Sequence, residues 1–438
     1  MATRSPPLVN AVRTAALVLG GGAADFDPLL DRVGDAQVVL IGEASHGTQE
    51  FYDLRARITR RLIEEKGFTA VAVEADWPAA YRVDRYVRGR SNDPNARAAL
   101  GDFRQFPVWM WRNTEVLGFV EWLRRRNAAA GASRATGFYG LDLYSMDRSA
   151  DAVIDYLANK DAAAARRART RYACFDRYGS DPEMYGYASG VAAKGLCADE
   201  AAAQLRELDQ RAAYPGPPDE ELFSARQNAR VVASGERYYR SMVNDPGGSW
   251  NLRDTHMMQT LDSLMRRDDG GRPQKIVVWA HNSHVGDMRA TEMGERGDIN
   301  IGQLARQQYR GRAVLVGFST YQGTVTAAPR WDAPATRWNV RPGIPGSYEA
   351  LFHDTGLPAF QLRLDDAALR GLATPRLQRA IGVVYQPATE RASHYFNTSV
   401  TQQFDWMIHI DTTHALEPLE PGKQWTSAVP PERSPSVP

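Results

Sequence analysis

The stretch VVLIGEASHGTQE, residues 38–50, joins a short apolar run to a turn that carries a glutamate and a histidine. A continuous apolar run that is rich in β-branched residues and bounded by glycine predicts a strand buried on both faces of a sheet. Gly42 and Gly47 frame Glu43 and His46, and we expect these glycines to let the chain turn tightly and to leave space for a reacting carbonyl. The stretch therefore predicts a strand whose carboxyl end presents chemically active side chains.

Similar apolar runs recur along the chain, each next to a helical pattern such as the helix expected over residues 49–66. Strands that are apolar along their whole length and alternate with helices are typical of a parallel sheet covered on both faces. The predicted fold class is therefore α/β, with a mostly parallel central sheet flanked by helices. The predicted strands cover residues 36–41, 69–73, 137–143, 275–279, 313–318, 359–362, 379–385 and 406–410.

The chain changes character between residues 148 and 272, where segments rich in Ala, Arg, Glu and Leu show no strand pattern. We expect a large all-helical insertion near the carboxyl ends of the strands, where it would form a lid or line a substrate cleft. Residues 1–147 and 273–417 would then form the two parts of one α/β core. The Pro- and Ser-rich segment 418–438 is predicted to be a disordered tail.

The charge of the chain is almost balanced, with 53 Lys and Arg residues against 52 Asp and Glu residues. This balance predicts no binding to nucleic acid or to an anionic membrane, and the apolar stretch 15–19 is too short for a signal-peptide core or a membrane span. The two cysteines, Cys174 and Cys197, have a spacing that favours neither a disulfide framework nor a zinc site. We therefore expect a soluble, cytoplasmic monomer whose partner is a small molecule.

Polar side chains follow four of the predicted strands at the point where each strand ends. The carboxyl ends of parallel strands meet at one edge of a sheet, and ligands bind there because loops and helix N-termini converge. Arg55 lies on the helix after the first of these strands, and its side chain is expected to lean back toward that strand end. The strand-end residues are Glu43 and His46, then Glu74 and Asp76, then Asp142, and finally His281 and His284.

This set of side chains supports hydrolysis of an ester or a lactone by activated water. A histidine can take a proton from water near neutral pH, and an adjacent carboxylate, Glu43 or Glu74, would orient its ring. An arginine and a second histidine that face the same cavity could stabilise the oxyanion formed as water attacks the carbonyl. The catalytic candidates are His46, Glu43, Glu74, Arg55, His284 and His281.

Two alternative chemistries use the same residues. Ser45 could be a nucleophile, although GEASHG lacks the G-x-S-x-G elbow and neighbouring side chains in a tight turn project in different directions. The histidines and glutamates also offer enough ligands for a catalytic zinc or manganese ion, but the H-E-x-x-H spacing is absent and an arginine is an awkward neighbour for a cation. We expect no cofactor, and a divalent metal is the alternative.

Aromatic residues between positions 106 and 111 could belong to the core or could line an apolar pocket for a bulky substrate. Together with polar and aromatic residues near the strand ends, they form the set of candidate substrate-binding residues. This set is Trp77, Phe106, Trp109, Trp111, Asp142 and Tyr144.

Several separated blocks of the chain resemble the erythromycin esterase family, in family order and over about residues 34–416. These blocks are IGEASHGTQEFYDLRARITRRLIEEKGFTAVAVEADWP, FRQFPVWMWRNTEVLGFVEWLR, GFYGLDLYS, NLRDTHM, KIVVWAHNSHVGD and VGFSTYQGTV. The resemblance implies an α/β core with a helical insertion, and it implies that His46 is the general base. It also implies that Glu43, Glu74, Arg55 and His284 complete the site, with His281 close by.

The resemblance further implies a substrate class. Family esterases of known activity open the macrolactone ring of macrolide antibiotics without a required metal, which would make this chain an antibiotic-resistance enzyme. Two other functions stay open at this point. One is a metal-dependent hydrolase that uses the same histidines and glutamates, and the other is a natural-product-binding or acyl-transfer protein that does not hydrolyse macrolides.

Overall fold

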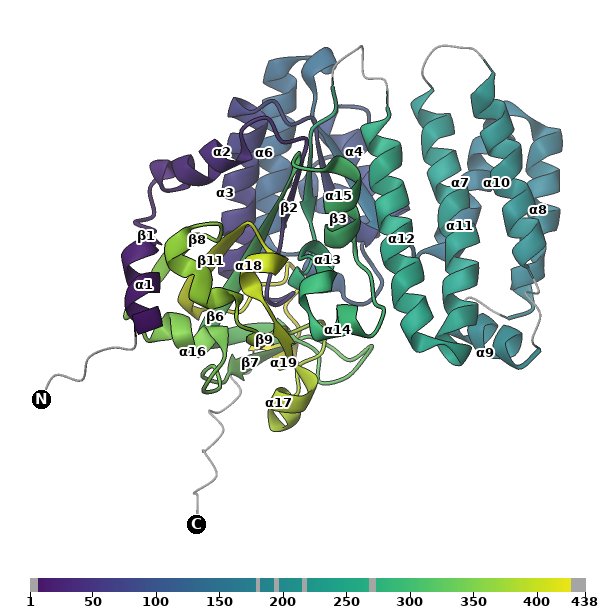
Figure 1. The fold of residues 1–438 in the computed structure, drawn as a ribbon. Coiled ribbons are helices and arrows are strands. Elements are labelled where there is room, and N and C mark those ends of the chain that lie inside the picture. Colours follow the sequence, from purple (N-terminus) through teal and green to yellow (C-terminus); the bar gives the residue numbers. More distant parts are fainter. Residues whose placement is uncertain (1–6, 179–181, 193–196, 215–218, 268–272, 427–438) are drawn as a thin grey trace, which may run out of the picture.

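The computed structural model describes residues 7–178, 182–192, 197–214, 219–267 and 273–426. Helices and strands alternate along most of this length (Figure 1). The strands are β1 (Leu17–Val18), β2 (Val38–Ile41), β3 (Ala70–Asp76), β4 (Gly137–Asp142), β5 (Ile276–Trp279), β6 (Ala313–Ala327), β7 (Thr336–Val340), β8 (Ala359–Arg363), β9 (Arg376–Arg379), β10 (Tyr395–Thr398) and β11 (Trp406–Thr413).

The α-helices of the first half are α1 (Pro7–Ala15), α2 (Asp27–Val33), α3 (Gln49–Glu65), α4 (Trp77–Val87), α5 (Ala96–Ala99), α6 (Thr114–Ala130), α7 (Met146–Lys160), α8 (Ala162–Asp176), α9 (Pro182–Ala192) and α10 (Ala198–Ala213). Those of the second half are α11 (Glu220–Asn244), α12 (Pro246–Met265), α13 (Asn282–Val285), α14 (Glu292–Glu295), α15 (Ile301–Tyr309), α16 (Tyr348–His353), α17 (Glu390–Ser393), α18 (Val400–Gln403) and α19 (Lys423–Thr426). Short 3-10 helices are η1 (Ala23–Phe26), η2 (Leu100–Asp102), η3 (Val108–Met110), η4 (Ala132–Arg134), η5 (Met288–Ala290), η6 (Ala367–Ala373) and η7 (Pro387–Thr389).

A nine-stranded sheet forms the centre of the molecule, in the order β1-β8-β11-β6-β2-β5-β3-β4, with β7 paired to β6. The strands from β11 to β4 along this order pair in parallel, whereas β8, β1 and β7 are antiparallel to their neighbours. This arrangement confirms the predicted α/β class with a central sheet flanked by helices. Parallel strands need crossover connections, and helices supply them here.

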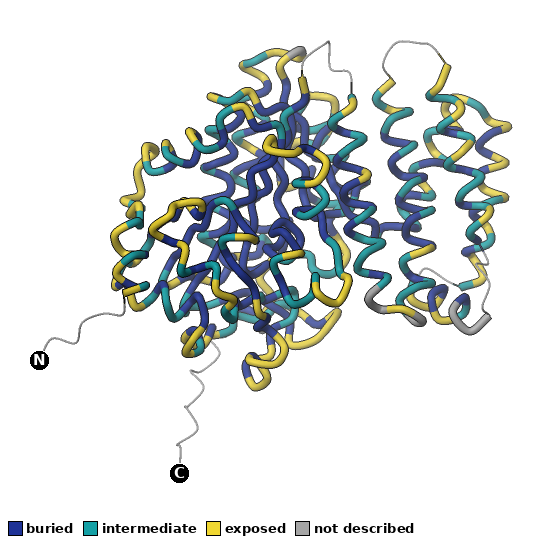
Figure 2. The backbone as a smooth tube through the Cα atoms, viewed as in Figure 1, coloured by how far each residue is buried: buried dark blue, intermediate teal, exposed yellow. Residues whose placement is uncertain are grey.

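Alternate residues of each central strand enter two different cores. Val39 and Ile41 of β2 pack with α2, α3 and α6, whereas Val38 and Leu40 pack with α12 and α15 on the other face. Side chains of a strand alternate between faces, so a strand covered on both sides must be apolar throughout. Figure 2 shows the result as continuously buried strands at the centre of the molecule.

The described residues between β4 and β5 form helices α7–α12. Helices α7–α11 stand together beside the sheet in Figure 1, with α12 between them and the sheet. Helices α7–α11 share a separate core that includes Val153, Leu157 and Leu208. The side chains of Glu183 and Tyr239, from α9 and α11, reach the cavity described below.

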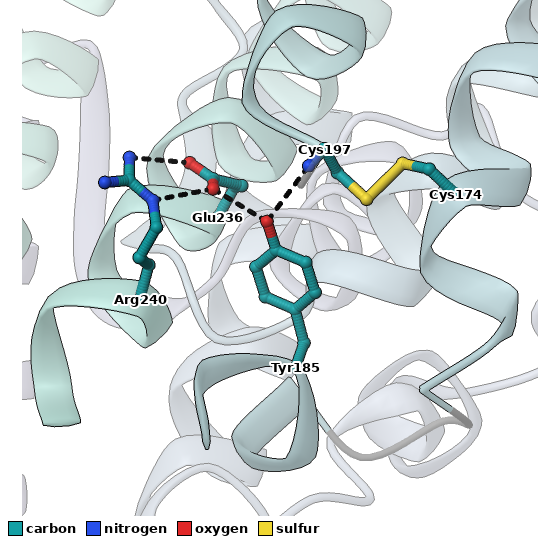
Figure 3. The surroundings of a disulfide bond; sticks show 5 residues. All are labelled: Cys174, Tyr185, Cys197, Glu236 and Arg240. Carbon is teal, nitrogen blue, oxygen red and sulfur yellow. Dashed lines mark hydrogen bonds and ion pairs between the residues drawn. A yellow bond between two sulfur atoms is a disulfide. The ribbon is translucent and has the colours of Figure 1, made fainter. Parts of the chain in front are cut away.

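A disulfide joins Cys174 of α8 to Cys197, the residue before α10, which corrects the expectation that the spacing of the two cysteines favours no disulfide framework (Figure 3). The spacing of two cysteines in a sequence does not reveal that helix packing brings their Cα atoms to 5.8 Å. The hydroxyl of Tyr185 lies beside the bond, where it accepts from the backbone N–H of Cys197 and donates to Glu236. The bond closes a loop that contains α9.

Reduction of this disulfide is expected to lower the free energy of unfolding by about 3 kcal/mol, because a cross-link over some 20 residues restricts the unfolded chain. Urea unfolding with and without a phosphine reductant would measure the difference, and a Cys174→Ser variant should not respond to the reductant. Alkylation of both cysteines in the folded protein before any reduction would contradict the pairing.

Two further expectations need correction. Residues 380–385 do not form a strand of the sheet; β9 ends at Arg379 and pairs with β10, and the chain then crosses the loop after β2, where Ile381 exchanges backbone hydrogen bonds with Ala44 and His46. The predicted tail is ordered at least to residue 426, because the buried indole of Trp425 donates to Thr326. Residues 427–438 lie outside the described residues.

Within the described part of the chain, no helix has the length and apolarity needed to cross a bilayer.

Candidate active site

A cavity of about 700 Å³ opens at the carboxyl ends of β2, β3, β4 and β5. It is lined by at least one predicted residue from each of these strand ends: His46, Glu74, Asp142, His281 and His284. Residues that lie up to 238 positions apart in the sequence, from His46 to His284, therefore meet at one place, as the parallel sheet predicts. Glu43 and Arg55 are not among the lining residues and lie beneath them.

His46 is oriented by a buried carboxylate. Its Nδ1 lies 2.8 Å from Oε1 of Glu43, and the other oxygen of Glu43 lies 2.7 Å from Nη2 of Arg55. A carboxylate accepts, so Nδ1 carries the proton and Nε2 is left as a free acceptor. That Nε2 is 4.0 Å from Oε1 of Glu74. The ring is thus held in the tautomer that a general base requires.

Arg55 supports the site without entering it. Its guanidinium is fully buried between the rings of Tyr52 and Trp279, 4.2 and 5.3 Å from their centroids. The predicted direction of its side chain, back toward Glu43, is therefore right. Its predicted contact with an oxyanion in the cavity is wrong, because Glu43 and His46 stand between Arg55 and the cavity.

The two glycines of GEASHG serve close packing and do not leave empty space. A Cβ on Gly42 would lie 2.1 Å from Oδ1 of Asn282, and one on Gly47 would lie 1.8 Å from the carbonyl oxygen of Thr326. Neighbouring chain already fills the volume that we expected to be open for a carbonyl. Ser45 is buried and its hydroxyl contacts that of Thr48, so it does not line the cavity.

Arg253, on α12, links the two acidic strand ends. Its guanidinium donates to both oxygens of Asp142 at 3.0 and 2.6 Å and to Oε1 of Glu74 at 2.7 Å. Burial would raise the pKa of Glu74, but His284, His46 and Arg253 outweigh this effect and hold the pKa well below its usual value. Glu74 is therefore a carboxylate at neutral pH, and its other oxygen accepts from the backbone N–H of His281 at 2.8 Å.

His284 is a buried cation. Its Nδ1 lies 2.9 Å from Oδ2 of Asp254, and its Nε2 lies 3.3 Å from Oε1 of Glu74. Nη1 of Arg253 lies 3.1 Å from the same Nε2, and its charge opposes a proton there. Burial would lower the pKa of His284, but the two carboxylates raise it to about 9. The ring stacks on Trp250 at 4.5 Å between centroids, which fixes its orientation. An imidazolium is thus available at the cavity wall across the neutral range.

The proton on His284 should make stability depend on pH. Because the folded pKa of about 9 exceeds the ordinary value of 6.5, this stabilisation is complete below about pH 6.5 and is lost as the pH rises through 9. We expect a loss of roughly 1–3 kcal/mol over that window, measured by urea unfolding. Asp254→Asn should move the upper end of the window to lower pH, and identical curves for the two proteins would contradict the assignment.

His281 is a neutral histidine at the cavity wall. The backbone N–H of Ser283 donates to its Nδ1 at 3.2 Å, so the proton resides on Nε2. Burial, together with the nearby His46, lowers the pKa of His281 well below its usual value. Its Nε2 is buried without a hydrogen-bond partner, and the ring centroid is 4.9 Å from that of His46. It can therefore donate a hydrogen bond to a group that enters beside His46.

The predicted substrate-binding residues divide into two groups. Phe106, Trp111, Asp142 and Tyr144 line the cavity. Trp77 does not, because at the start of α4 it packs into the core, where it stacks on Tyr139 and donates to Ser224. Trp109 packs into the core beside α6 and does not line the cavity either. Aromatic composition alone does not show which side of a segment faces a cavity.

Three observations bear on whether these residues could hold a metal ion. Among the residues that the structure describes, no group of three or more His, Cys, Asp and Glu side chains is placed to hold one. The guanidinium of Arg253 occupies the position between Glu74 and Asp142 that a cation would take. The nitrogen of His46 that faces away from the cavity is bonded to Glu43.

Sequence reasoning missed Arg253 and Asp254 as site residues. Both lie in the block NLRDTHM on α12, where Asp254 is buried and Arg253 is partly exposed at the cavity wall. An Arg-Asp pair inside an otherwise helical pattern is a weak signal, because such pairs are usually solvated. Only the packing of α12 shows that they meet Asp142 and His284.

The chain matches the model of a known protein family over most of its length. The model of the erythromycin esterase family matches residues 63–413, which include Glu74, Asp142, Arg253, His281 and His284. The chain belongs to the erythromycin esterase family. Membership suggests an ester hydrolase. A curated relative, the erythromycin esterase type II of Escherichia coli, is 24% identical over 326 residues, covering 69% of this chain and 73% of that protein.

Solved structures share the fold of this erythromycin esterase family member. A protein from Bacillus cereus has a TM-score of 0.79 at 21% identity, and a succinoglycan biosynthesis protein has a TM-score of 0.78 at 21% identity. Each comparison covers 94% of this chain and 98% of the other. A mutant erythromycin esterase in its open conformation has a TM-score of 0.68 at 16% identity, covering 90% of this chain and 94% of the other.

Proposed function

We propose that this protein hydrolyses a carboxylic ester or lactone with a water molecule activated by His46. The observation that supports this most is the pair of Glu43 and His46, which leaves Nε2 of the histidine as an acceptor at the cavity, 4.0 Å from Glu74. A water molecule in that gap would donate to both groups, because the distance is too long for a direct hydrogen bond.

The steps follow from the protonation states. Nε2 of His46 takes a proton from the water while the water oxygen attacks the carbonyl carbon of the ester. The carbonyl oxygen then becomes an oxyanion. The tetrahedral intermediate then breaks the bond to the alcohol oxygen, which takes the proton back from His46. His281 donates its Nε2–H to the oxyanion, and the imidazolium of His284 adds positive charge at the same wall.

The remaining residues position this machinery. Arg55 binds the second oxygen of Glu43, and Glu43 in turn fixes the ring of His46. Arg253 and His284 hold Glu74 as a carboxylate, which keeps an acceptor beside the water. We propose no cofactor, since the side chains present supply the base, the acceptor and the oxyanion donors.

The walls of the cavity suit a bulky apolar substrate with a few polar groups. Phe103, Phe106, Met110, Trp111 and Met288 form an apolar surface around the catalytic side chains. The volume of about 700 Å³ is in the range of pockets that enclose a drug-sized ligand. Because the relative from Escherichia coli carries the name erythromycin esterase, macrolides are the first substrates to test, and resistance to them is the biological role we propose.

The test is hydrolysis in ¹⁸O-labelled water, followed by mass spectrometry of a panel of macrolides and 4-nitrophenyl esters. We expect one labelled oxygen in the acid product and none in the alcohol. Unchanged substrate that co-elutes with the protein would indicate a binding protein, and transfer to an added alcohol or amine would indicate an acyltransferase. Activity that is lost on dialysis against a chelator and restored by zinc or manganese would replace the metal-free mechanism with a metal-dependent one.

A further inference from the structure

Asp76 places in the cavity a carboxyl that the mechanism does not use. It ends β3 two residues after Glu74, and it lines the cavity together with the catalytic side chains. Its strand partner in the β3–β4 register is Asp142, the carboxylate that Arg253 binds. The mechanism above gives Asp76 no role.

The carboxyl of Asp76 is not used by the adjacent helix. Asp76 occupies the N-cap position of α4, where an aspartate usually accepts from a backbone N–H of the first turn, yet its side chain makes no capping hydrogen bond. Pro78 in the first turn lacks an N–H, which removes one of the donors such a cap would use. The helix therefore does not use this carboxyl, which lines the cavity with Ser145 beside it.

One oxygen of this carboxyl lacks a partner. Oδ1 of Asp76 is buried and forms no hydrogen bond. The neighbouring cations are engaged elsewhere, since Arg148 lies 3.0 Å from Asp102 and Arg253 binds Asp142 and Glu74. A buried polar atom without a partner costs stability, so its presence at a cavity points to a ligand that supplies the partner.

The protonation state of Asp76 indicates which ligand group would fit. Burial and the charge of Asp142 raise the pKa of Asp76 to about 7, against smaller opposing effects of Arg148 and Ser145. The group is thus both carboxyl and carboxylate near neutral pH. A hydroxyl matches both forms, because it donates to a carboxylate and accepts from a protonated carboxyl, whereas an ammonium group matches only the first.

We propose that Asp76 is a specificity-determining residue that hydrogen-bonds to a hydroxyl of the substrate, so that hydroxylated esters are preferred over matched esters without that hydroxyl. This inference rests on the proposed hydrolase function. Asp76 acts on binding, and the chemistry at His46 does not pass through it.

The test compares wild type with Asp76→Ala and Asp76→Asn on 4-nitrophenyl hexanoate and its 2-hydroxy and 3-hydroxy analogues. For the hydroxylated ester with the lowest KM, Asp76→Ala should raise KM about tenfold with little change in kcat, the loss expected for one hydrogen bond to a buried partner. Asp76→Asn should restore most of the affinity, because an amide also donates and accepts. KM for the plain hexanoate should stay within about twofold for all proteins.

A second measurement needs no substrate. Removal of a buried carboxyl oxygen that has no partner should leave the unfolding temperature of Asp76→Ala unchanged or raise it by about 1–2 °C. The control is Asp365→Ala, which removes an aspartate that does not line the cavity and should change neither KM nor the unfolding temperature.

Three outcomes would overturn the inference: equal effects of Asp76→Ala on plain and hydroxylated esters, no effect on either, or a fall in the unfolding temperature of several degrees. Wild type that hydrolyses none of the esters would instead count against the proposed function, and the unfolding temperatures would then decide whether Asp76 has a structural role.

Discussion

Replacement of His46 by glutamine is expected to lower kcat for ester hydrolysis by about 10³-fold, because general-base catalysis contributes on the order of 10²–10⁴. Glutamine fills similar space and can still bond to Glu43, but its amide cannot take a proton from water at neutral pH. The folded structure should persist, since the ring is held by one hydrogen bond and lies at the cavity wall. Initial rates at saturating substrate would measure the loss.

The matched control for this experiment is His414→Gln. His414 also pairs with a glutamate, Glu50, but it is exposed and does not line the cavity. Its replacement should leave kcat unchanged within about twofold. Full activity in the His46 variant, with circular dichroism like that of wild type, would eliminate His46 as the base.

Replacement of Arg253 by methionine is expected to have the second largest effect, with a loss of at least 10²-fold in kcat/KM. Methionine fills similar volume but leaves Glu74 and Asp142 buried next to each other without their shared cation. The pKa of Glu74 should then rise, because the guanidinium of Arg253, one of the groups that lower it, is gone. A protonated Glu74 would no longer accept from the attacking water or hold His284 as a cation.

The same substitution should destabilise the protein by about 3 kcal/mol, because an uncompensated buried charge is costly. The double variant Arg253→Met/Asp142→Asn tests this cause, since it removes one of the two stranded charges. It should regain much of the stability in urea unfolding and little of the activity. If the single variant matches wild type in both measurements, Arg253 has neither role.

These two experiments distinguish the role of His46 from that of Arg253, although both side chains line the same cavity. His46 acts on the reacting water, so its loss should appear in kcat. Arg253 acts through Glu74 and His284, so its loss should appear in the pH dependence as well as in the rate. A variant of Arg55 would behave differently from either, because that side chain is fully buried behind Glu43 and can influence the reaction only by moving His46.

Much of the site could be predicted from strand ends alone. The parallel sheet brings the carboxyl ends of β2, β3, β4 and β5 to one edge, so Glu43, His46, Glu74 and the two histidines after β5 had to lie near one another. The apolar runs of these strands indicate this arrangement because a strand covered on both faces is apolar where it crosses the core. The direction of Arg55 followed from the lean of helical side chains.

Other features depend on packing between segments that are distant in the chain. Arg253 reaches Asp142 across 111 positions, and the two cysteines meet only because helices pack. The run 380–385 looks like any other strand, yet it crosses the loop after β2 because the loop between Ala44 and His46 offers it hydrogen bonds. The indole of Trp425 donates to a threonine of β6. The Pro- and Ser-rich composition of the tail does not predict this contact in its first half.

The sequence by itself determined the α/β class, the edge of the sheet where the site lies and the identity of its histidines and glutamates, since these depend on periodicity and on residues that directly follow strands. Only the tertiary structure decided which side chains face the cavity, which tautomer each histidine adopts and which cation holds the carboxylates. Those properties arise from contacts between segments that are distant in the chain, and a pattern along the chain does not predict such contacts.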